Sequence, residues 1–256
     1  MEFSGGWDSV ATLVEGRWVE RRPRRPEVAE QLLRETRVMP WLAPLLPLPV
    51  PVPVVVEADP LVVRHALVPG EPLTTPRADH GRVLGGFLRA LHGSSAVAAV
   101  RHGVAPAAAT HRDRAATVGR FRAQVVPRVP ASHRDCADAV LADACELPAD
   151  TVVHGDLGPE HILVADDRVS GVIDFGDLHL GDAANDLAWP LYGAPAEFAA
   201  AVAAAYEPTD DLRRRALLWH RLGPWHEVLH GLDTGDEAAV RSGLAGVIER
   251  LALGVR

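Results

Sequence analysis

The segment from Thr151 to Asp177 constrains the fold more than any other part of the chain. Its sequence, TVVHGDLGPEHILVADDRVSGVIDFGD, contains three short apolar runs that lie beside acidic residues and histidines. Short runs of β-branched residues bounded by Gly, Asp and Pro are typical of buried strands, and Asp166-Asp167 suits the turn between two of them. The segment therefore predicts a strand–loop–strand–turn–strand unit with charged side chains in its turns.

Composition excludes several classes of function. The 256 residues carry a formal net charge of −8, which repels polyanions, argues against general nucleic-acid binding and favours a cationic ligand. All 26 basic residues are arginine, because the chain contains no lysine. A Walker A phosphate loop, a Schiff base and a lysine general base are therefore excluded.

The cellular location is predicted from the length of the apolar runs, the N-terminal pattern and the spacing of the cysteines. No apolar run reaches 18 residues, and the N-terminus lacks the basic-then-apolar pattern of a signal peptide, so we expect a cytoplasmic protein. Cys136 and Cys145 are nine residues apart, a spacing that fits neither a zinc knuckle nor a redox pair. We expect them to be buried thiols in a reducing compartment.

The first 70 residues predict a small β-sheet that carries one helix. Strands are expected at residues 9–14, 17–22, about 53–57 and 61–68. Glu15-Gly16 is a tight hairpin signal between the first two strands. Residues 26–42 have apolar residues at helical spacing, with Pro26 suited to the first turn. The prolines of residues 46–53 exclude a central helix or ladder strand before the third strand.

The rest of the chain, apart from the segment already described, is predicted to be helical. Residues 81–95, about 111–146 and the stretch beyond Asp182 carry apolar residues at helical intervals. The pattern predicts an α+β, bilobal fold. Its small β-rich N-terminal lobe with the hinge spans residues 1–70, and its larger, mostly helical C-terminal lobe spans residues 71–256.

Three side chains in the turns of the central unit are candidates for chemistry. Asp156 follows the first strand, His161 opens the second and Asp174 ends the third. If the second and third strands pair, His161 and Asp174 come to the same end of the hairpin, and Asp156 faces them. An isolated Asp or His in a turn is more often structural, but carboxylates are the ligands that Mg²⁺ prefers. The combination of the three favours a metal and catalytic site.

The spacing HGD-x₄-H followed by IDFGD resembles the catalytic and metal-binding core of the aminoglycoside phosphotransferase family, relatives of eukaryotic-type protein kinases. Most members have Asn where His161 stands, whereas the 2″-type enzymes resemble this chain in carrying His. SGGWDSVATLV resembles the nucleotide-covering hairpin of the family, LLRET its ion-pairing helix, RHALVPGEPL its hinge and LGGFLRALH the helix after the hinge. The resemblance implies a protein-kinase-like fold and phosphoryl transfer from Mg²⁺-bound ATP or GTP to a hydroxyl of a small molecule, most simply an antibiotic.

The resemblance also implies a role for each matching residue. Asp156 would accept or orient the proton of the attacking hydroxyl, and His161 and Asp174 would hold Mg²⁺ on the nucleotide phosphates. The residues expected to bind the nucleotide are Ser9 at the phosphates, Arg21 with its partner Glu35, and the backbone groups of Ala66 and Val68 at the purine. Asp182 and Asp186 match positions that brace the catalytic loop.

Two features depart from the family pattern. Arg21 falls where the family has a phosphate-contacting lysine, and Arg22, Arg24 and Arg25 are rival candidates for that position. Arginine keeps the charge but is not interchangeable with lysine, and a solvated basic run at the end of a strand is the structural alternative. The short stretch before Gly5 also predicts that the roof over the nucleotide is incomplete or completed by another segment.

The acceptor is expected to be a cationic antibiotic, because ammonium groups are best met by carboxylates. The predicted substrate-binding residues in the C-terminal lobe are Glu207, Asp211, Trp225 and Glu227. Asp210, Asp233, Asp236 and Trp219 are further candidates. The stretch GPWHEVLHGLDTGD, residues 223–236, is the best cluster, although each of these residues alone is more often a solvated helix charge or a core aromatic.

Other functions stay open from the sequence. A kinase of choline, a sugar or an amino acid would use the same core, and so would an enzyme acting on a macrolide or a cyclic peptide. A nucleotide-binding pseudoenzyme is suggested by the missing lysine. A metal-dependent hydrolase is disfavoured, because the ligands lack a second His at metal-site spacing. The sequence does not distinguish ATP from GTP and does not define the oligomeric state.

Overall fold

The N-terminal part of the molecule is an antiparallel sheet. The computed structural model describes residues 9–253, so the predicted glycine turn at residues 5–8 lies outside the described residues. The strands are β1 (Ser9–Val14), β2 (Trp18–Pro23), β3 (Val54–Ala58) and β4 (Leu61–Ala66), in the order β1-β2-β4-β3. Glu15 and Gly16 both have positive φ, 53° and 68°, as the tight turn between β1 and β2 requires.

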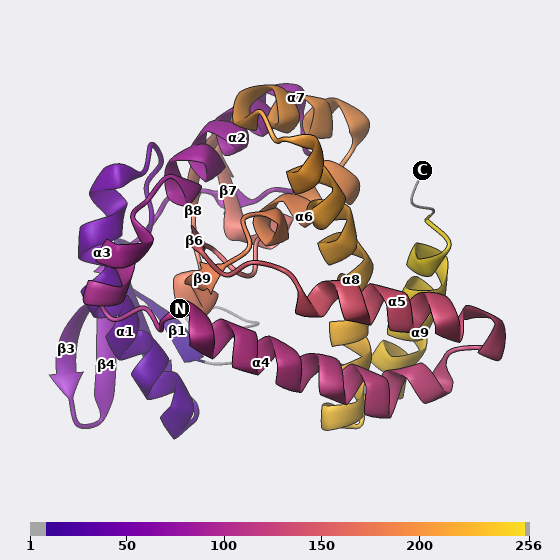
Figure 1. The fold of residues 1–256 in the computed structure, drawn as a ribbon. Helices are drawn as coiled ribbons and strands as arrows, with labels where there is room; N and C mark the ends of the chain where they lie inside the picture. Colours follow the sequence, from indigo (N-terminus) through magenta and orange to yellow (C-terminus); the bar gives the residue numbers. More distant parts are fainter. Residues whose placement is uncertain (1–8, 254–256) are drawn as a thin grey trace.

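One helix, α1 (Pro26–Leu42), packs against this sheet (Figure 1). Its buried residues recur at the predicted helical spacing, and Pro26 occupies its first turn, where its missing N–H costs nothing. Val28 and Leu32 form a small apolar core with Val63 of β4. Glu35 is also buried on this face, which places a carboxylate inside the molecule beside β2.

Two small sheets hold the acidic turns. In one, the order is β5 (Glu71–Pro72), β7 (Ile162–Ala165) and β8 (Arg168–Val172); in the other, β6 (Thr151–Val153) pairs with β9 (His179–Gly181). Asp166 and Asp167 both have positive φ and form the turn between β7 and β8. The predicted strand–loop–strand–turn–strand unit is therefore present, and β9 is an additional partner that the sequence pattern did not indicate.

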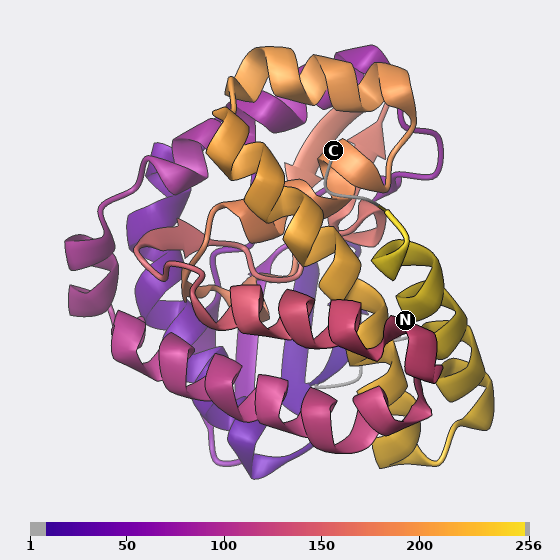
Figure 2. The same cartoon turned by 45° about the vertical axis from the view of Figure 1, so that its right-hand side comes forward.

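Helices make up most of the remaining chain. They are α2 (Ala78–His92), α3 (Ala96–Arg101), α4 (Ala107–Arg120), α5 (Arg134–Cys145), α6 (Ala184–Tyr192), α7 (Ala196–Tyr206), α8 (Asp210–Thr234) and α9 (Glu237–Leu251). The stretch predicted to be helical from about 111 to 146 consists of two α-helices joined by short helical turns. Pro127 and Pro130 interrupt it, and α5 turns back to run beside α4 (Figure 2).

Two apolar cores divide the helical part between them. One lies under the acidic turns, where α2, α6 and α7 pack around Phe87, Phe175 and Phe198. The other joins α4, α5, α8 and α9 around Phe121 and Trp225.

The sequence-based view of the cysteines needs a correction. Cys136 and Cys145 are free and exposed rather than buried. They lie at the two edges of the α5 face that buries Ala137, Leu141 and Ala144, because positions beside the single apolar face of a helix reach solvent. Among the described residues, no helix is long and apolar enough to cross a membrane.

The arrangement is a β-sheet region followed by a helical region, as expected for the α+β class (Figure 1). The chain passes from one to the other after β4, where Leu67 donates its backbone N–H to the Arg17 carbonyl at 2.8 Å. The boundary at residue 70 between two lobes stays a prediction.

Candidate active site

Strand pairing brings Asp156, His161 and Asp174 together. Ile162 of β7 lies opposite Val172 of β8, and the residues just outside that pair continue the contact, since Ile173 donates its N–H to the His161 carbonyl at 2.9 Å. The His161 ring lies between the two carboxylates. Its Nδ1 is 3.9 Å from Asp156 Oδ2, and its Nε2 is 3.7 Å from Asp174 Oδ2.

One hydrogen bond orients the His161 ring and leaves its second nitrogen facing Asp174. Nδ1 lies 2.7 Å from the Asp156 backbone carbonyl. Because a carbonyl oxygen can only accept a hydrogen bond, Nδ1 carries the proton and donates it. In the neutral ring, Nε2 then carries the lone pair and faces Asp174. Metal-binding histidines are oriented in this way by a carbonyl at the other nitrogen.

Asp174 has the geometry of a residue held in place for a ligand. Its backbone is left-handed, with φ of 65°, a region that Asp tolerates better than most residues but that still carries strain. Its side chain is 50% exposed. The described residues contain no cluster of three or more His, Cys, Asp or Glu able to hold a metal alone. This donor pair therefore fits Mg²⁺ that takes its remaining ligands from phosphates and water.

A buried carboxylate holds the loop that carries Asp156. Asp186 of α6 accepts the backbone N–H of His154 at 2.7 Å and of Gly155 at 3.0 Å, and His92 Nε2 lies 3.0 Å away. Burial by itself raises the pKa of Asp186, but His92, His154 and the backbone N–H of Gly155 together outweigh it and lower the pKa. The structure thus agrees with the bracing role that the resemblance implied for Asp186.

A second buried carboxylate, Asp182, ties α6 to α8. It accepts hydrogen bonds from Arg215, from Trp219 Nε1 at 3.0 Å and from the backbone N–H of Ala184 at 3.1 Å. Because Trp219 also lines the acceptor side of the site, this contact positions α8 relative to the catalytic segment.

The structure distinguishes Arg21 from its rivals. Arg21 Nη1 lies 2.7 Å from Glu35 Oε2, and Nη2 lies 3.9 Å from Asp174 Oδ1. Arg22 points to the opposite face of β2 and pairs with Glu20 at 2.9 Å, because successive side chains of a strand alternate between faces. Arg21 therefore lies between Glu35 of α1 and Asp174, whereas Arg22 does not.

The Arg21–Glu35 pair is almost dry. The Glu35 side chain is 3% exposed, and its Oε1 has no hydrogen-bond partner among the described residues. Burial raises the pKa of Glu35 to about 7, although Arg21 opposes that rise. Ser9 Oγ accepts a third contact of the same guanidinium, from Nε at 3.1 Å.

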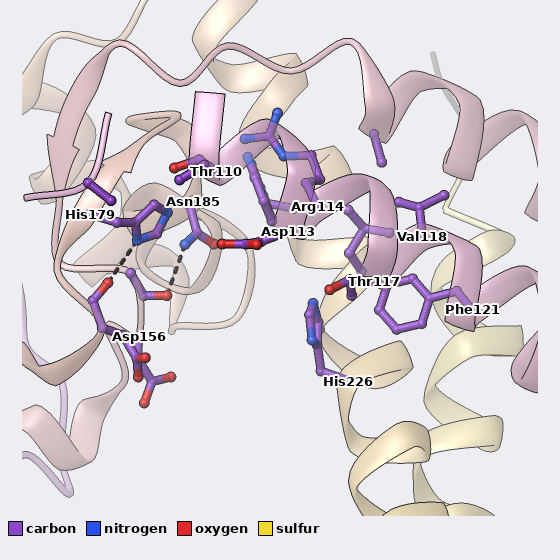
Figure 3. A pocket seen from close by; sticks show the side chains of 18 of the residues that line it. Thr110, Asp113, Arg114, Thr117, Val118, Phe121, Asp156, His179, Asn185 and His226 are labelled. Atoms are coloured by element: carbon purple, nitrogen blue, oxygen red, sulfur yellow. Dashed lines mark hydrogen bonds between the residues drawn. The ribbon is translucent and has the colours of Figure 1, made fainter. Parts of the chain in front are cut away.

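A cavity of about 690 Å³ opens beside Asp156. Figure 3 shows Thr110, Asp113, Thr117 and Phe121 along one wall, with His226 of α8 next to them. The opposite wall comes from the loop after β6 and the first turn of α6, where Asn185 Nδ2 donates to the Gly155 carbonyl at 3.0 Å. The further lining residues are Arg34, Ala105, Ala109, Arg114, Val118, Ala144, Gly155, Asp177, His179, Trp219, Leu222 and Gly223.

The predicted substrate-binding residues lie outside this cavity. Trp225 is wrong as a stacking residue, because its ring is fully buried in the core against Phe121. Glu207 pairs with Arg89 on the surface, and Asp211 pairs with Arg214 and Arg215. Glu227 is exposed but does not line the cavity.

Two residues of the predicted cluster 223–236 do line the cavity: Gly223 and His226, which lies between Trp225 and Glu227 in the sequence. Sequence reasoning missed the contribution of α4 altogether. Thr110, Asp113, Thr117 and Phe121 are spaced by three or four residues, the interval that puts side chains on one helical face. The signal that could have found them is the helical spacing of the polar residues Thr110, Asp113 and Thr117 in an otherwise Ala-rich stretch.

Known proteins are similar to this chain in sequence and in fold. A family model described as the phosphotransferase enzyme family matches residues 1–218. Viomycin phosphotransferase of Streptomyces vinaceus is 30% identical over 149 residues, which are 49% of this chain and 46% of that enzyme, so the match spans less than half the length of the relative.

Two solved structures are also similar. The GDP and kanamycin complex of APH(2″)-IIIa has a TM-score of 0.85 and 24% identity, over 99% of this chain and 93% of that one. The macrolide 2′-phosphotransferase MphH from Brachybacterium faecium has a TM-score of 0.75 and 27% identity, over 96% and 90% of the two chains. Because its identity to this chain is only 24%, the first of these structures is evidence for the fold alone. Because the family model covers most of the sequence and the acidic turns converge as its fold requires, the chain belongs to the phosphotransferase enzyme family.

Proposed function

We propose that the protein transfers the γ-phosphate of a magnesium-bound nucleoside triphosphate to a hydroxyl of a small molecule, an aminoglycoside or another antibiotic. One observation carries the proposal. Asp156 lies between a pair of metal-type ligands on one side and a cavity of about 690 Å³ on the other. A base in that position faces both reactants of a phosphoryl transfer.

Asp156 would act on the acceptor hydroxyl. Its side chain is 63% exposed and therefore accessible to a ligand. The backbone of the two preceding residues is fixed by hydrogen bonds to Asp186. Hydrogen bonding of the hydroxyl to this carboxylate orients the oxygen and takes up its proton as the oxygen attacks the γ-phosphate. Positioning and charge neutralisation supply most of the rate enhancement in such reactions.

The donor would lie on the opposite side of Asp156. Asp174 and His161 would hold Mg²⁺, which when bound neutralises charge on the phosphate oxygens. Arg21 would add a guanidinium to the same phosphates. The backbone of Ala66 and Val68 would meet the purine at the junction after β4, and that mode of recognition admits ATP or GTP. Relatives with this fold are known as GDP complexes, which supports a nucleotide donor.

The cavity supports a cationic acceptor with an apolar face. Asp113, Asp156 and Asp177 bring carboxylates to its wall. The two arginines of the lining are engaged elsewhere, since Arg34 donates to the Gly176 carbonyl and Arg114 donates to the Leu147 and Pro148 carbonyls. Phe121, Trp219 and several alanines complete the surface. Related phosphotransferases are named for viomycin, a macrolide and aminoglycosides, so an antibiotic is the acceptor class that we propose.

Nucleotide turnover against a panel of acceptors tests the proposal. Purified protein with Mg²⁺ and ATP or GTP should release nucleoside diphosphate faster when a suitable antibiotic is added, and the product should gain one phosphate by mass. The panel contains aminoglycosides, macrolides, tuberactinomycins and choline, with reactions lacking Mg²⁺ as the control. Stimulation by choline alone would favour a metabolite kinase. Tight nucleotide binding without stimulation by any acceptor would favour a pseudoenzyme.

A further inference from the structure

We propose that Ser9 is a positioning residue for Arg21, and that it aims the guanidinium at the nucleotide phosphates by accepting a hydrogen bond from Nε. This role rests on the proposed function, because it concerns how the nucleotide is held. It differs from a direct contact between Ser9 and phosphate, since the serine acts through the arginine.

The sheet register places the two side chains on one face. In the β1–β2 hairpin, Ala11 lies opposite Arg21 and Ser9 lies opposite Pro23. Ser9 and Arg21 are therefore diagonal neighbours, a separation that a long side chain spans. The Ser9 residue is 6% exposed and the Arg21 side chain 13%, so water competes little for their contact.

The three nitrogens of Arg21 have three different environments. Nε lies 3.1 Å from Ser9 Oγ, Nη1 lies 2.7 Å from Glu35 Oε2, and Nη2 lies 3.9 Å from Asp174 Oδ1. The guanidinium is planar and rigid. Two anchored nitrogens therefore define its plane, and the third is directed toward the carboxylate that would hold the metal on the phosphates.

Only an arginine is able to use Ser9 in this way. A lysine at position 21 has a methylene group where arginine has Nε, so it offers no donor to the hydroxyl at that point of the side chain. The pair of Ser9 and Arg21 thus compensates for the absence of lysine in this chain. An arginine without the serine would keep its bond to Glu35 but would be free to rotate about it.

A double-mutant cycle on nucleotide affinity tests the coupling. Ser9→Ala, Arg21→Lys and the double variant are compared with the parent protein for binding of Mg²⁺ complexes of non-hydrolysable ATP and GTP analogues by calorimetry. A hydrogen bond to a charged group corresponds to about a tenfold change in affinity. Ser9→Ala should weaken nucleotide binding about tenfold in the parent and less than about twofold in the Arg21→Lys background.

Two further measurements separate positioning from folding. Ser9→Cys keeps the shape of the side chain but supplies a poor acceptor, so its nucleotide affinity should fall like that of Ser9→Ala. The second variant keeps the test valid if the first one does not fold. Arg22→Lys, on the other face of β2, is the matched arginine control and should bind the nucleotide like the parent. In turnover assays, Ser9→Ala should raise the KM for nucleotide and leave the KM for the acceptor unchanged.

The outcomes are distinct. An equal loss of affinity on replacing Ser9 in both backgrounds would show that the serine acts without Arg21 and would overturn the inference. Unchanged affinity of Ser9→Ala in the parent background would overturn it as well. If the parent protein itself bound neither Mg²⁺–nucleotide analogue, the proposed function would fail together with the inference.

Discussion

The two sides of Asp156 are built in different ways. On the side where we propose that the phosphate donor binds, Arg21, Glu35 and Ser9 form a nearly dry network. On the acceptor side, α4 and α8 flank an open cavity whose polar residues come from several elements. The proposed donor side is compact and pre-paired, whereas the proposed acceptor side, which Figure 3 shows, is roomy and mixed in character.

This difference follows from what each side has to recognise. Phosphates and a divalent cation are the same in every reaction of this type, and a preorganised set of charges binds them with little reorganisation. Acceptors vary in size and charge. Side chains on the exposed face of a helix can be replaced without disturbing the core behind it, so a helix wall can adapt to different acceptors more easily than a buried charge network can. We therefore expect substitutions on the donor side to affect every acceptor alike and substitutions on the acceptor side to affect acceptors selectively.

The largest effect is expected for Asp156→Asn, at the boundary of the two sides. The amide cannot take up a proton, so kcat should fall by about 10²–10⁴ or more. Mg²⁺–nucleotide affinity should stay near that of the parent, as measured by calorimetry. A fully active Asn variant would remove Asp156 from the mechanism and would leave the two sides without a shared catalytic group.

Glu35→Gln probes the dry donor network and should have the next largest effect on binding. Loss of the charge facing Arg21 should weaken nucleotide binding about tenfold to a hundredfold, with the acceptor KM unchanged. Exposed Glu30→Gln, on the same helix, is the control.

The same variant tests the pKa of Glu35. Burial raises that pKa to about 7 from an ordinary value of 4.5, so the folded state binds the proton more tightly than the unfolded state. The contribution of Glu35 to stability is therefore full below pH 4.5 and is lost as the pH rises through 7. Glu35→Gln should gain stability relative to the parent between pH 5 and 8, by about 1–3 kcal/mol in denaturant unfolding. A constant difference across this range would argue against the raised pKa.

Asp113→Asn probes the acceptor side alone. If the carboxylate meets an ammonium group of the acceptor, its loss should raise the acceptor KM about fivefold for cationic acceptors, and the nucleotide KM should not change. Asp138→Asn on α5, exposed and outside the cavity, is the matched control. An equal rise in the nucleotide KM would break the separation between the two sides.

The smallest effect concerns the scaffold behind the acceptor side. Burial, with Arg250 nearby, lowers the pKa of His220 on α8 from 6.5 to about 4. The folded state therefore favours the neutral ring, and this contribution is full above pH 6.5 and is lost as the pH falls toward 4. His220→Gln should reduce the loss of stability between pH 7 and 5 by about 1 kcal/mol or less in thermal or denaturant unfolding. The exposed His111→Gln is the control, and identical pH profiles for His220→Gln and the parent would contradict the prediction.

Local sequence patterns were enough to predict the catalytic segment. The runs around His161 and Asp174 have the length and composition of strands, and a tight turn at Asp166-Asp167 allows one antiparallel pairing that keeps both apolar faces buried. The helix from Pro26 to Leu42 was also predicted with its bounds, because its periodic apolar residues and proline start are local signals. In these parts of the chain, each structural feature depends on residues that are close together in the sequence.

Long-range packing decided the rest. The choice of Arg21 among neighbouring arginines depends on which face of β2 turns toward Glu35, fourteen residues later in the chain. The difference between buried Trp225 and cavity-lining Trp219 depends on how α8 rotates against α4 and α9. Both tryptophans have the same local preferences, so their spacing alone did not separate them.

The sequence by itself therefore determined the strands of the N-terminal sheet, the helix from Pro26 to Leu42 and the acidic turns, since hydrophobic period and turn residues act locally. Only the tertiary structure decided which charges become dry and paired, and which helix faces form the acceptor wall. Burial and pairing depend on atoms contributed by segments that are distant in the chain, as the contacts of Ser9, Glu35 and Asp174 with one guanidinium demonstrate.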